Sequence, residues 1–366
     1  MRQLLRNIAE IGAGQGAPQG ESNYCDYGIP FVKAGNLQEL TAGGSIDDIQ
    51  KVSEEVAKIH KLKLYPKGTV LFAKSGMSCL KGYVYTLPQD AYVVSHLACI
   101  TPKEDISEYL RLYFTFHRPN QLVKDAAYPS ISLADIGNLE IDTRDEQTRE
   151  HIILTLRSVE EIIAIRKQEL SVLDDLIKAR FVEMFGDIIR NNKGWPQYVF
   201  SDIATSRLGK MLDAKQQTGK YKYPYLANFN VQWFRFELEN LNEMDFNEAD
   251  QVEFQLNDGD LLVCEGGEIG RCAVWHNEIQ PCYFQKALHR VRCNTDVVLP
   301  DYLARWFQYN CEHGGFASIE GAKATIAHLP GAKLKMLKAT VPPIELQERF
   351  VSFVAQIDKS KSAIQK

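Results

Sequence analysis

Basic side chains gather in loops of the second half of the chain. The segment 207–222, RLGKMLDAKQQTGKYK, carries five Lys or Arg and one acid, and 321–338 carries four lysines, one histidine and no acid. Lysine and arginine interleaved with Gln, Ser and Tyr suit the anchoring of phosphates and the reading of base edges. The net charge of the chain is −5, so any contact with nucleic acid must be local.

The same residue types predict candidate DNA contacts in both halves of the chain. In the first half they are Lys33, Asn36, Lys74, Ser75, Lys81 and Ser130. In the second half they are Arg207, Lys210, Lys215, Lys220, Lys222, Tyr223, Lys286, His289, Lys323, His328 and Lys333. A solvated surface is the alternative, and for any single charge it is the better explanation; the two dense patches together favour binding.

Catalytic signatures are absent from the sequence. It contains no phosphate-binding loop, no pair of His or Cys at zinc spacing and no nucleophile turn. The glycines of 12–16, GAGQG, lack the spacing of a dinucleotide site and predict a surface turn. Eight scattered cysteines without a C-x-x-C pair, and no run of 18 apolar residues, predict a reduced cytoplasmic protein that avoids membranes. No catalytic residue, metal or cofactor is expected on this chain.

The chain repeats itself. The segment 68–76, GTVLFAKSG, returns as GDLLVCEGG at 259–267. Other pairs keep the same order: 29–37 with 223–231, 92–102 with 283–293, 108–116 with 301–309, 128–141 with 322–341, and 145–156 with 345–357, the last aligned on Gln147 and Gln347. Each copy predicts short strands and helices followed by one long helix.

The element that must position these copies is a long helix. No Gly or Pro interrupts 144–185, and apolar residues alternate at spacings of three and four, as in a coiled coil. A shorter apolar helix follows Pro342 and Pro343. Because a lone helix cannot bury its apolar stripe, we expect the two helices to pack antiparallel. A gene duplication joined by an ordinary interdomain helix is the alternative.

With these features the chain resembles the specificity subunits of type I restriction–modification systems. The segment 341–358, VPPIELQERFVSFVAQID, is similar to the opening of that family's spacer helix, and 259–271 and the duplicated layout support the likeness. The resemblance implies a non-catalytic reader of a bipartite double-stranded DNA target. It also implies two modification subunits, which bind S-adenosylmethionine and methylate adenine, and restriction subunits that cleave.

The expected fold is α+β, with two similar globular target-recognition domains separated by long antiparallel coiled-coil helices in a pseudo-two-fold repeat. The predicted domains are residues 1–143 and 187–341, and the spacer helices are 144–186 and 342–366. Partner docking and helix pairing are assigned to Gln147, Leu156, Val159, Ile163, Leu170, Leu173, Ile177, Gln347, Phe350, Phe353 and Ile357. The competing hypothesis is a helical scaffold whose two heads bind proteins. A split nuclease–methylase with its catalytic half on another chain also stays open.

Overall fold

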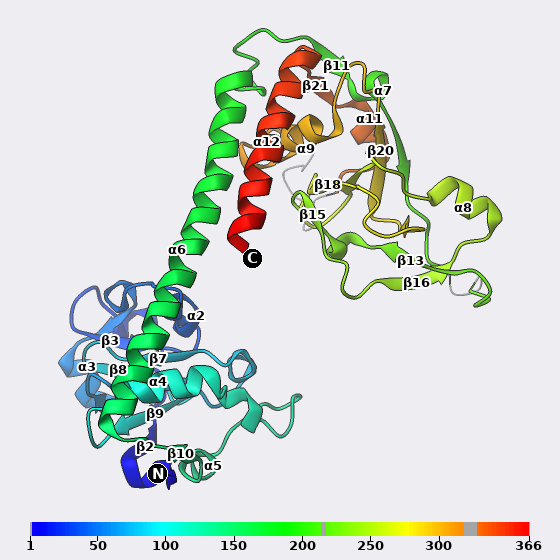
Figure 1. Ribbon diagram of the computed structural model, residues 1–366. Helices are drawn as coiled ribbons and strands as arrows, with labels where there is room; N and C mark the ends of the chain where they lie inside the picture. The colour runs from blue at the N-terminus through cyan, green and yellow to red at the C-terminus, as the bar shows by residue number, and fades with distance from the viewer. Residues whose placement is uncertain (1, 214–216, 318–327, 366) are drawn as a thin grey trace. The chain divides into compact units, whose positions relative to one another are not determined.

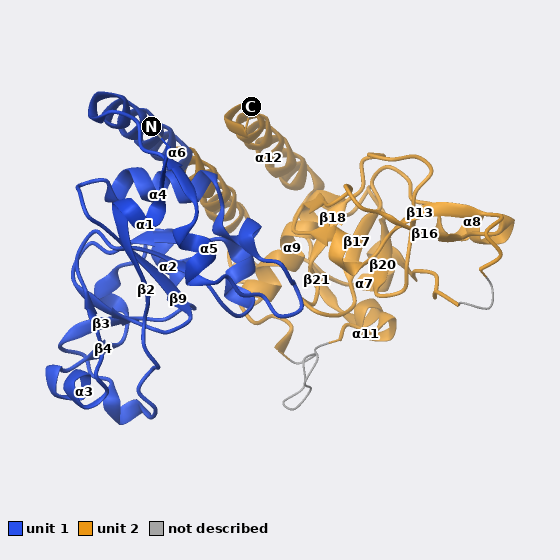
Figure 2. Cartoon of the chain, turned by 90° about the horizontal axis from the view of Figure 1, so that it is seen from below, with its two compact units in different colours: residues 1–164 blue, residues 165–366 orange. Residues whose placement is uncertain are grey.

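The computed structural model describes residues 2–213, 217–317 and 328–365. The chain divides into two compact units, Met1–Ala164 and Ile165–Lys366, shown in blue and orange in Figure 2. We call them unit 1 and unit 2. Each has its own buried core, and each is described by itself.

Unit 1 is built on two four-stranded sheets. The first has the order β2-β9-β6-β7 and is antiparallel, and the second has the order β4-β3-β8-β5 with β3 parallel to β8. The strands are β1 (Arg2–Leu4), β2 (Ala9–Ala13), β3 (Ile29–Val32), β4 (Lys51–Val52), β5 (Leu64–Tyr65), β6 (Val70–Ala73), β7 (Val84–Thr86), β8 (Ala91–Val93), β9 (Leu97–Pro102) and β10 (Glu140–Asp142). The helices are α1 (Leu5–Ile8), α2 (Asn36–Thr41), α3 (Glu54–Ile59), α4 (Ser107–Phe116) and α5 (Leu133–Gly137).

Unit 2 repeats this plan. Its main sheet has the order β12-β20-β17-β18, and a three-stranded sheet has the order β16-β13-β19. The strands are β11 (Gln197–Val199), β12 (Ala204–Leu208), β13 (Lys222–Leu226), β14 (Val231–Gln232), β15 (Arg235–Phe236), β16 (Asn242–Asp245), β17 (Leu261–Cys264), β18 (Cys272–Val274), β19 (Tyr283–Phe284), β20 (Leu288–Cys293) and β21 (Lys338–Thr340). The helices are α7 (Phe200–Ile203), α8 (Glu248–Phe254), α9 (Pro300–Glu312) and α11 (Gly331–Met336).

The glycine-flanked run that opens the repeat forms the central strand of each main sheet. These strands are β6 and β17, and all four residues of each are buried. A strand covered on both faces reads as a continuous apolar run rather than an alternating one. The sequence VLFA and its counterpart LLVC therefore belong at the centre of a sheet, where the structure places them.

Equivalent hydrogen bonds close the corresponding turns of the two units. Gly14 N donates to Leu97 O (3.3 Å) in unit 1, as Gly209 N donates to Leu288 O (3.0 Å) in unit 2. The hydroxyl of Tyr109 donates to Asp142 O (2.5 Å), as that of Tyr302 donates to Thr340 O (2.8 Å). The predicted internal repeat is therefore present in the backbone as well as in the sequence.

Two long helices follow the repeats. These are α6 (Glu146–Phe185) and α12 (Ile344–Gln365), drawn in green and red in Figure 1. Gly186, at φ +74°, ends α6 in the left-handed conformation that glycine adopts readily. The amino-terminal stretch of α6 is bound to unit 1, where Arg111 on α4 donates to Glu160 (2.7 Å) and Arg157 donates to Glu108 (3.1 Å).

Within unit 2 the two helices are antiparallel. Near one end of the contact the rings of Phe181 and Phe350 lie 5.4 Å apart, and near the other end Lys361 Nζ lies 2.5 Å from Asp174 Oδ1. Residue numbers rise along one helix as they fall along the other, so the predicted antiparallel packing is confirmed for this stretch (Figure 1). Helix α12 thus covers part of the apolar face of the carboxyl-terminal half of α6, at Phe181 and Phe185.

The predicted seam is buried along only part of α6. Ile177 is fully buried and Leu170 and Leu173 are half-buried, whereas Leu156, Val159 and Ile163 are exposed. On α12, Phe350 is buried, and Phe353 and Ile357 pack against the same core. In the described part of the chain, the seam is therefore a helix pair in its second half and a single helix in its first half.

Two expectations were wrong in detail. The glycines of 12–16 are not a surface turn at their start, because β2 runs through Ala13 and pairs with β9. A Cβ built on Gly14 would lie 1.9 Å from Val93 O, so this position needs a glycine for close backbone approach. The alignment of Gln147 with Gln347 is also off by two residues. Gln147 is exposed, whereas Arg149 donates to Arg144 O as Gln347 donates to Pro342 O.

Candidate nucleic-acid interface

Three turns meet at the end of the main sheet in unit 1. Ser75 pairs with Ser130 in an isolated antiparallel bridge, and Ser75 Oγ lies 2.8 Å from His96 Nδ1. The backbone fixes the same turns, because Lys74 N donates to His96 O (2.9 Å) and Ile131 N donates to Lys74 O (2.7 Å). We call Ser75, His96 and Ser130 turn cluster 1. It offers hydroxyl and imidazole groups that can both donate and accept hydrogen bonds.

Unit 2 brings the same three turns together with different side chains. Gly266 pairs with His328 in an antiparallel bridge, Glu265 N donates to Ala287 O (2.9 Å), and Leu329 N donates to Glu265 O (2.7 Å). We call Gly266, Ala287 and His328 turn cluster 2. Two framework positions match between the units, but their chemistry differs, since Glu265 stands where unit 1 has Lys74 and Gly266 where it has Ser75.

Residues predicted to bind DNA in unit 1 lie on or beside these turns. Lys74, Ser75 and Ser130 belong to the turns themselves. Asn36 Oδ1 accepts a hydrogen bond from Lys33 N (2.9 Å), and Lys33 Nζ lies 4.1 Å from the centre of the Tyr24 ring. Lys81 is exposed and donates to Gln38 Oε1 (3.2 Å). The segment that carries Lys33 joins the turns through the backbone, because Val94 N donates to Val32 O (2.9 Å).

Several predicted contacts of unit 2 are engaged within the fold. Lys210 Nζ pairs with Asp250 Oδ2 (2.5 Å) and has a side chain that is 11% exposed. Arg207 pairs with Glu253 and lies over the Phe254 ring. These two side chains tie β12 to α8, which leaves them little freedom to reach a phosphate.

His289 is also internal. Its Nε2 lies 2.9 Å from Leu329 O, and the residue is 1% exposed. Burial lowers the pKa of the imidazole, although the carbonyl of Leu329 and the charge of Glu265 act in the opposite direction. His289 therefore holds the segment that follows His328 against the main sheet.

The remaining predicted residues of unit 2 lie on exposed segments. Lys220, Lys222, Lys286, His328 and Lys333 are exposed, and Tyr223 is half-buried against Tyr283. Lys286 N donates to Lys210 O (2.8 Å), so the turn with Lys286 adjoins β12. Lys215 and Lys323 lie outside the described residues. For all of these side chains, DNA contact stays a prediction.

Some exposed side chains beside turn cluster 1 were not predicted from the sequence. Tyr128 is 82% exposed and Met77 is 68% exposed, and they flank the bonded pair Gly76 N to Pro129 O (3.0 Å). His96 completes the cluster but stands in an apolar stretch without other charges. A search for Lys and Arg misses such groups; looking for exposed aromatic side chains beside glycine turns would have found Tyr128.

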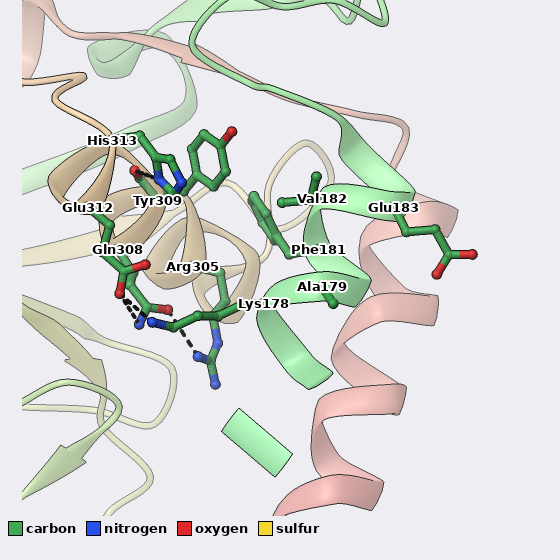
Figure 3. Close-up of a pocket in the computed structure, with 10 residues that line it drawn as sticks. All are labelled: Lys178, Ala179, Phe181, Val182, Glu183, Arg305, Gln308, Tyr309, Glu312 and His313. Carbon is green, nitrogen blue, oxygen red and sulfur yellow. Dashed lines mark hydrogen bonds and ion pairs between the residues drawn. The ribbon is translucent and has the colours of Figure 1, made fainter. Parts of the chain in front are cut away.

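A groove of about 610 Å³ lies between α6 and α9 within unit 2 (Figure 3). Phe181, Val182 and Tyr309 give it apolar walls, and Lys178 pairs with Glu312 at 2.7 Å. Arg305, 7% exposed, lies with its Cζ 3.4 Å from the centre of the Phe234 ring, and burial lowers its pKa to about 10. The groove thus has apolar walls beside the Lys178–Glu312 ion pair, and its lining holds no nucleophile paired with a base.

Neither a metal site nor a membrane-spanning helix occurs in the described residues. They contain no cluster of three or more His, Cys, Asp or Glu suited to hold a metal ion. All eight cysteines are free thiols. No helix in this part of the chain has both the length and the apolarity needed to cross a bilayer.

Comparison with known proteins agrees with this architecture. The family model of the type I restriction modification DNA specificity domain matches residues 4–174 and again 192–366. The MjaIX specificity subunit of Methanocaldococcus jannaschii is 30% identical over 138 residues, which are 37% of this chain and 31% of that protein. The match thus spans about a third of the curated relative.

Solved structures share the fold over the full chain. The S subunit from M. genitalium superposes with a TM-score of 0.53 at 12% identity, covering 100% of this chain and 91% of that one. A chain from a structure on complex assembly and conformational transition of the type I R-M system gives a TM-score of 0.55 at 15% identity, covering 100% and 91%. Because the domain model matches both halves, the chain belongs to the family of type I restriction–modification DNA specificity subunits, the non-catalytic components of those systems.

Proposed function

We propose that this chain reads a bipartite double-stranded DNA target, one part with each unit. The observation that carries the proposal is the difference between the two turn clusters. One framework, with the same strand order and the same bridges, presents Ser75 and Ser130 in unit 1 and Gly266 and His328 in unit 2. A repeated scaffold with altered side chains fits two half-sites of different sequence.

The long helices would then set the separation of the half-sites and dock two modification subunits. The exposed apolar residues of α6, among them Leu156, Val159 and Ile163, support docking because such patches commonly mark interfaces. The groove with Phe181 and Tyr309 adds apolar surface in unit 2. S-adenosylmethionine would be bound by the modification subunits, and restriction subunits would complete the complex in the cytoplasm.

The experiment is to express the chain with its modification subunits and map methylated adenines across a genome. The proposal expects one split motif, with a gap of constant length. Exchanging residues 187–339 for those of a relative should change one half of the motif and leave the other unchanged. If both halves changed together, the assignment of one half-site to each unit would be wrong.

The competing scaffold hypothesis makes a different prediction for the same material. A chain whose units bind proteins would show no sequence-dependent DNA affinity, and its weak DNA binding would not distinguish the methylated motif from a scrambled one. Binding measured against salt concentration with both duplexes separates the two cases, because phosphate contacts give a steep salt dependence.

A further inference from the structure

One buried carboxylate organises an exposed, lysine-bearing loop of unit 2. Asp245, at the end of β16, is 4% exposed. Its Oδ2 accepts hydrogen bonds from the backbone N and the hydroxyl (2.8 Å) of Thr218, and from Gly219 N (2.6 Å). Its Oδ1 accepts another from Tyr221 N (3.2 Å). A single side chain thus binds three backbone N–H groups within four consecutive residues, 218–221.

The backbone of Asp245 extends the same arrangement. Its N–H donates to Gln217 Oε1 (2.9 Å), and its carbonyl accepts from Lys210 Nζ (2.6 Å). Burial raises the pKa of the carboxyl group, but the hydrogen bonds from Thr218, Gly219 and Tyr221 outweigh burial, and the pKa is lowered. The carboxylate is therefore charged at neutral pH, and charge-assisted bonds of this kind are the stronger class.

The loop that Asp245 holds is exposed. Every residue of 218–222 is exposed; Lys220 lies two residues before β13, and Lys222 is the first residue of that strand. An exposed loop with two lysines would lose much conformational freedom on meeting a ligand. A loop that is already fixed by its own core avoids most of that cost, and its side chains meet the ligand in one geometry.

Unit 1 does not use this device at the equivalent place. In unit 1 Ile29 pairs with Val52, and in unit 2 Tyr223 pairs with Met244. The residue that follows each of these partners is therefore equivalent, which is Ser53 in unit 1 and Asp245 in unit 2. Ser53 Oγ accepts from Val56 N (3.3 Å) and caps α3 instead. The segment before β3 is held by a backbone bridge from Cys25 to Lys51. The carboxylate is thus a feature of unit 2.

We propose that Asp245 is a positioning residue for the half-site read by unit 2. Its carboxylate holds Thr218–Lys222 in the shape that meets DNA, and the lysines of the loop make the contact. The inference rests on the proposed function. It goes beyond that function because it names the group that fixes one recognition loop and limits its effect to one half-site.

The test uses the full chain in complex with its modification subunits, after methylation mapping has defined the motif. Affinity is measured by fluorescence anisotropy for three duplexes: the intact motif, one with the unit 2 half-site scrambled and one with the unit 1 half-site scrambled. Asp245→Asn removes the charge with little change in size. Asp296→Asn, at an exposed aspartate of the same unit, is the control.

Asp245→Asn should weaken binding of the intact motif about tenfold, since hydrogen bonds to a charged group are replaced by weaker ones. The same loss should appear when the unit 1 half-site is scrambled. It should vanish when the unit 2 half-site is scrambled, because the contact is then already lost. The control should bind all three duplexes like the unaltered chain. A uniform loss on all three duplexes would point to a structural role alone and overturn the proposal.

Folding is checked with the four tryptophans, Trp195, Trp233, Trp275 and Trp306, which all lie in unit 2. If Asp245→Asn unfolds unit 2, Thr218→Val is the second test. It removes the hydroxyl that donates to Asp245 and accepts from Lys220 N, and it keeps the carboxylate. We expect about a threefold loss of affinity, confined to the unit 2 half-site. Unchanged affinity in a folded variant overturns the inference. If the unaltered complex binds all three duplexes equally, the proposed function fails, and the inference fails with it.

Discussion

Gln347 on α12 and Arg149 on α6 occupy equivalent places in the two units. Gln347 Nε2 donates to Pro342 O (2.7 Å), and Arg149 Nη1 donates to Arg144 O (2.9 Å), in each case to a carbonyl five residues back. Each side chain joins the start of its long helix to the end of the preceding globular part. The two units thus attach their helices at the same point with different side chains.

Replacing Gln347 should detach the start of α12. Gln347 is fully buried, accepts from Leu299 N (2.9 Å) and donates to Val297 O (3.0 Å) as well as to Pro342 O. Gln347→Ala leaves these buried groups without partners, and we expect the free energy of unfolding of unit 2 to fall by about 2–3 kcal/mol. Urea unfolding followed by tryptophan fluorescence measures it. The exposed Gln356→Ala on the same helix should change stability by less than about 0.5 kcal/mol; equal effects would contradict the assignment.

The stability of unit 2 should fall in mild acid because His289 is buried in its neutral form. Its folded-state pKa is lowered from the ordinary 6.5, mainly by burial, so the unfolded chain binds the proton more readily. The stabilisation of unit 2 by neutral His289 is intact above about pH 6.5, and it is lost as the pH falls toward the lowered pKa of the folded state. Urea midpoints at pH 7.5 and 5.5 measure this, and His289→Gln should reduce the difference. The exposed His276→Gln is the control; an undiminished difference in the His289 variant would refute the prediction.

Lys220 and Lys222 should act as phosphate anchors. Replacing both by Ala should weaken binding to the intact motif and to the duplex with the unit 1 half-site scrambled, because the loop is docked on both. It should also reduce the slope of log affinity against log salt by about two. The control replaces two exposed lysines on the long helices, Lys167 and Lys359, and keeps the same net charge change. If the two double variants behave alike, the loss reflects overall charge, and the loop is not part of the interface.

The length of α6 should set the gap between half-sites. Residues up to 160 are bonded within unit 1, and residues from 174 onward contact α12, so a heptad copied from 163–169 disturbs neither attachment. The insertion adds about 10 Å and turns the helix by about 20°, which should lengthen the gap by up to about three base pairs.

Methylation mapping of the heptad variant should show unchanged half-sites with a longer gap. A five-residue insertion is the comparison, since it adds a similar length but turns one end by about 140°. That variant should lose methylation at any split site. An active heptad variant with the original gap would show that the separation of the half-sites is set elsewhere, most plainly by the modification subunits.

Most of the architecture could be predicted from the sequence, because the repeat and the apolar seam of the helices are patterns that extend over many residues. The repeated run at 259–267 contains the observed strand Leu261–Cys264, and the helix predicted at 144–186 is observed as Glu146–Phe185. Pairing of Gly14 with β9 was missed because a glycine close to a neighbouring backbone looks in sequence like a flexible one. Likewise, Gln147 was aligned with Gln347 because both are glutamine, whereas the pairing of the preceding strands, which the sequence does not show, makes Arg149 the equivalent residue.

The candidate contacts were harder to predict, because a positive charge in sequence does not show where its partner lies. Lys210 and Lys220 read alike, yet one is paired with Asp250 and the other lies on an exposed loop. Asp245 gave no signal in the sequence, since the residues that it binds lie 24 to 27 positions away along the chain. Such long-range side-chain bonds arise from the tertiary fold, which local patterns do not record.

The turn clusters are held together by main-chain atoms, and this has a consequence for how the protein can change. The bonds from Lys74 N to His96 O and from Glu265 N to Ala287 O need no particular side chain at either end. Mutation can therefore replace serine by glycine or histidine there while the strands keep their register. If these clusters read DNA as we propose, a lineage of such proteins would acquire new targets through single substitutions at few positions, without first gaining stability elsewhere to compensate.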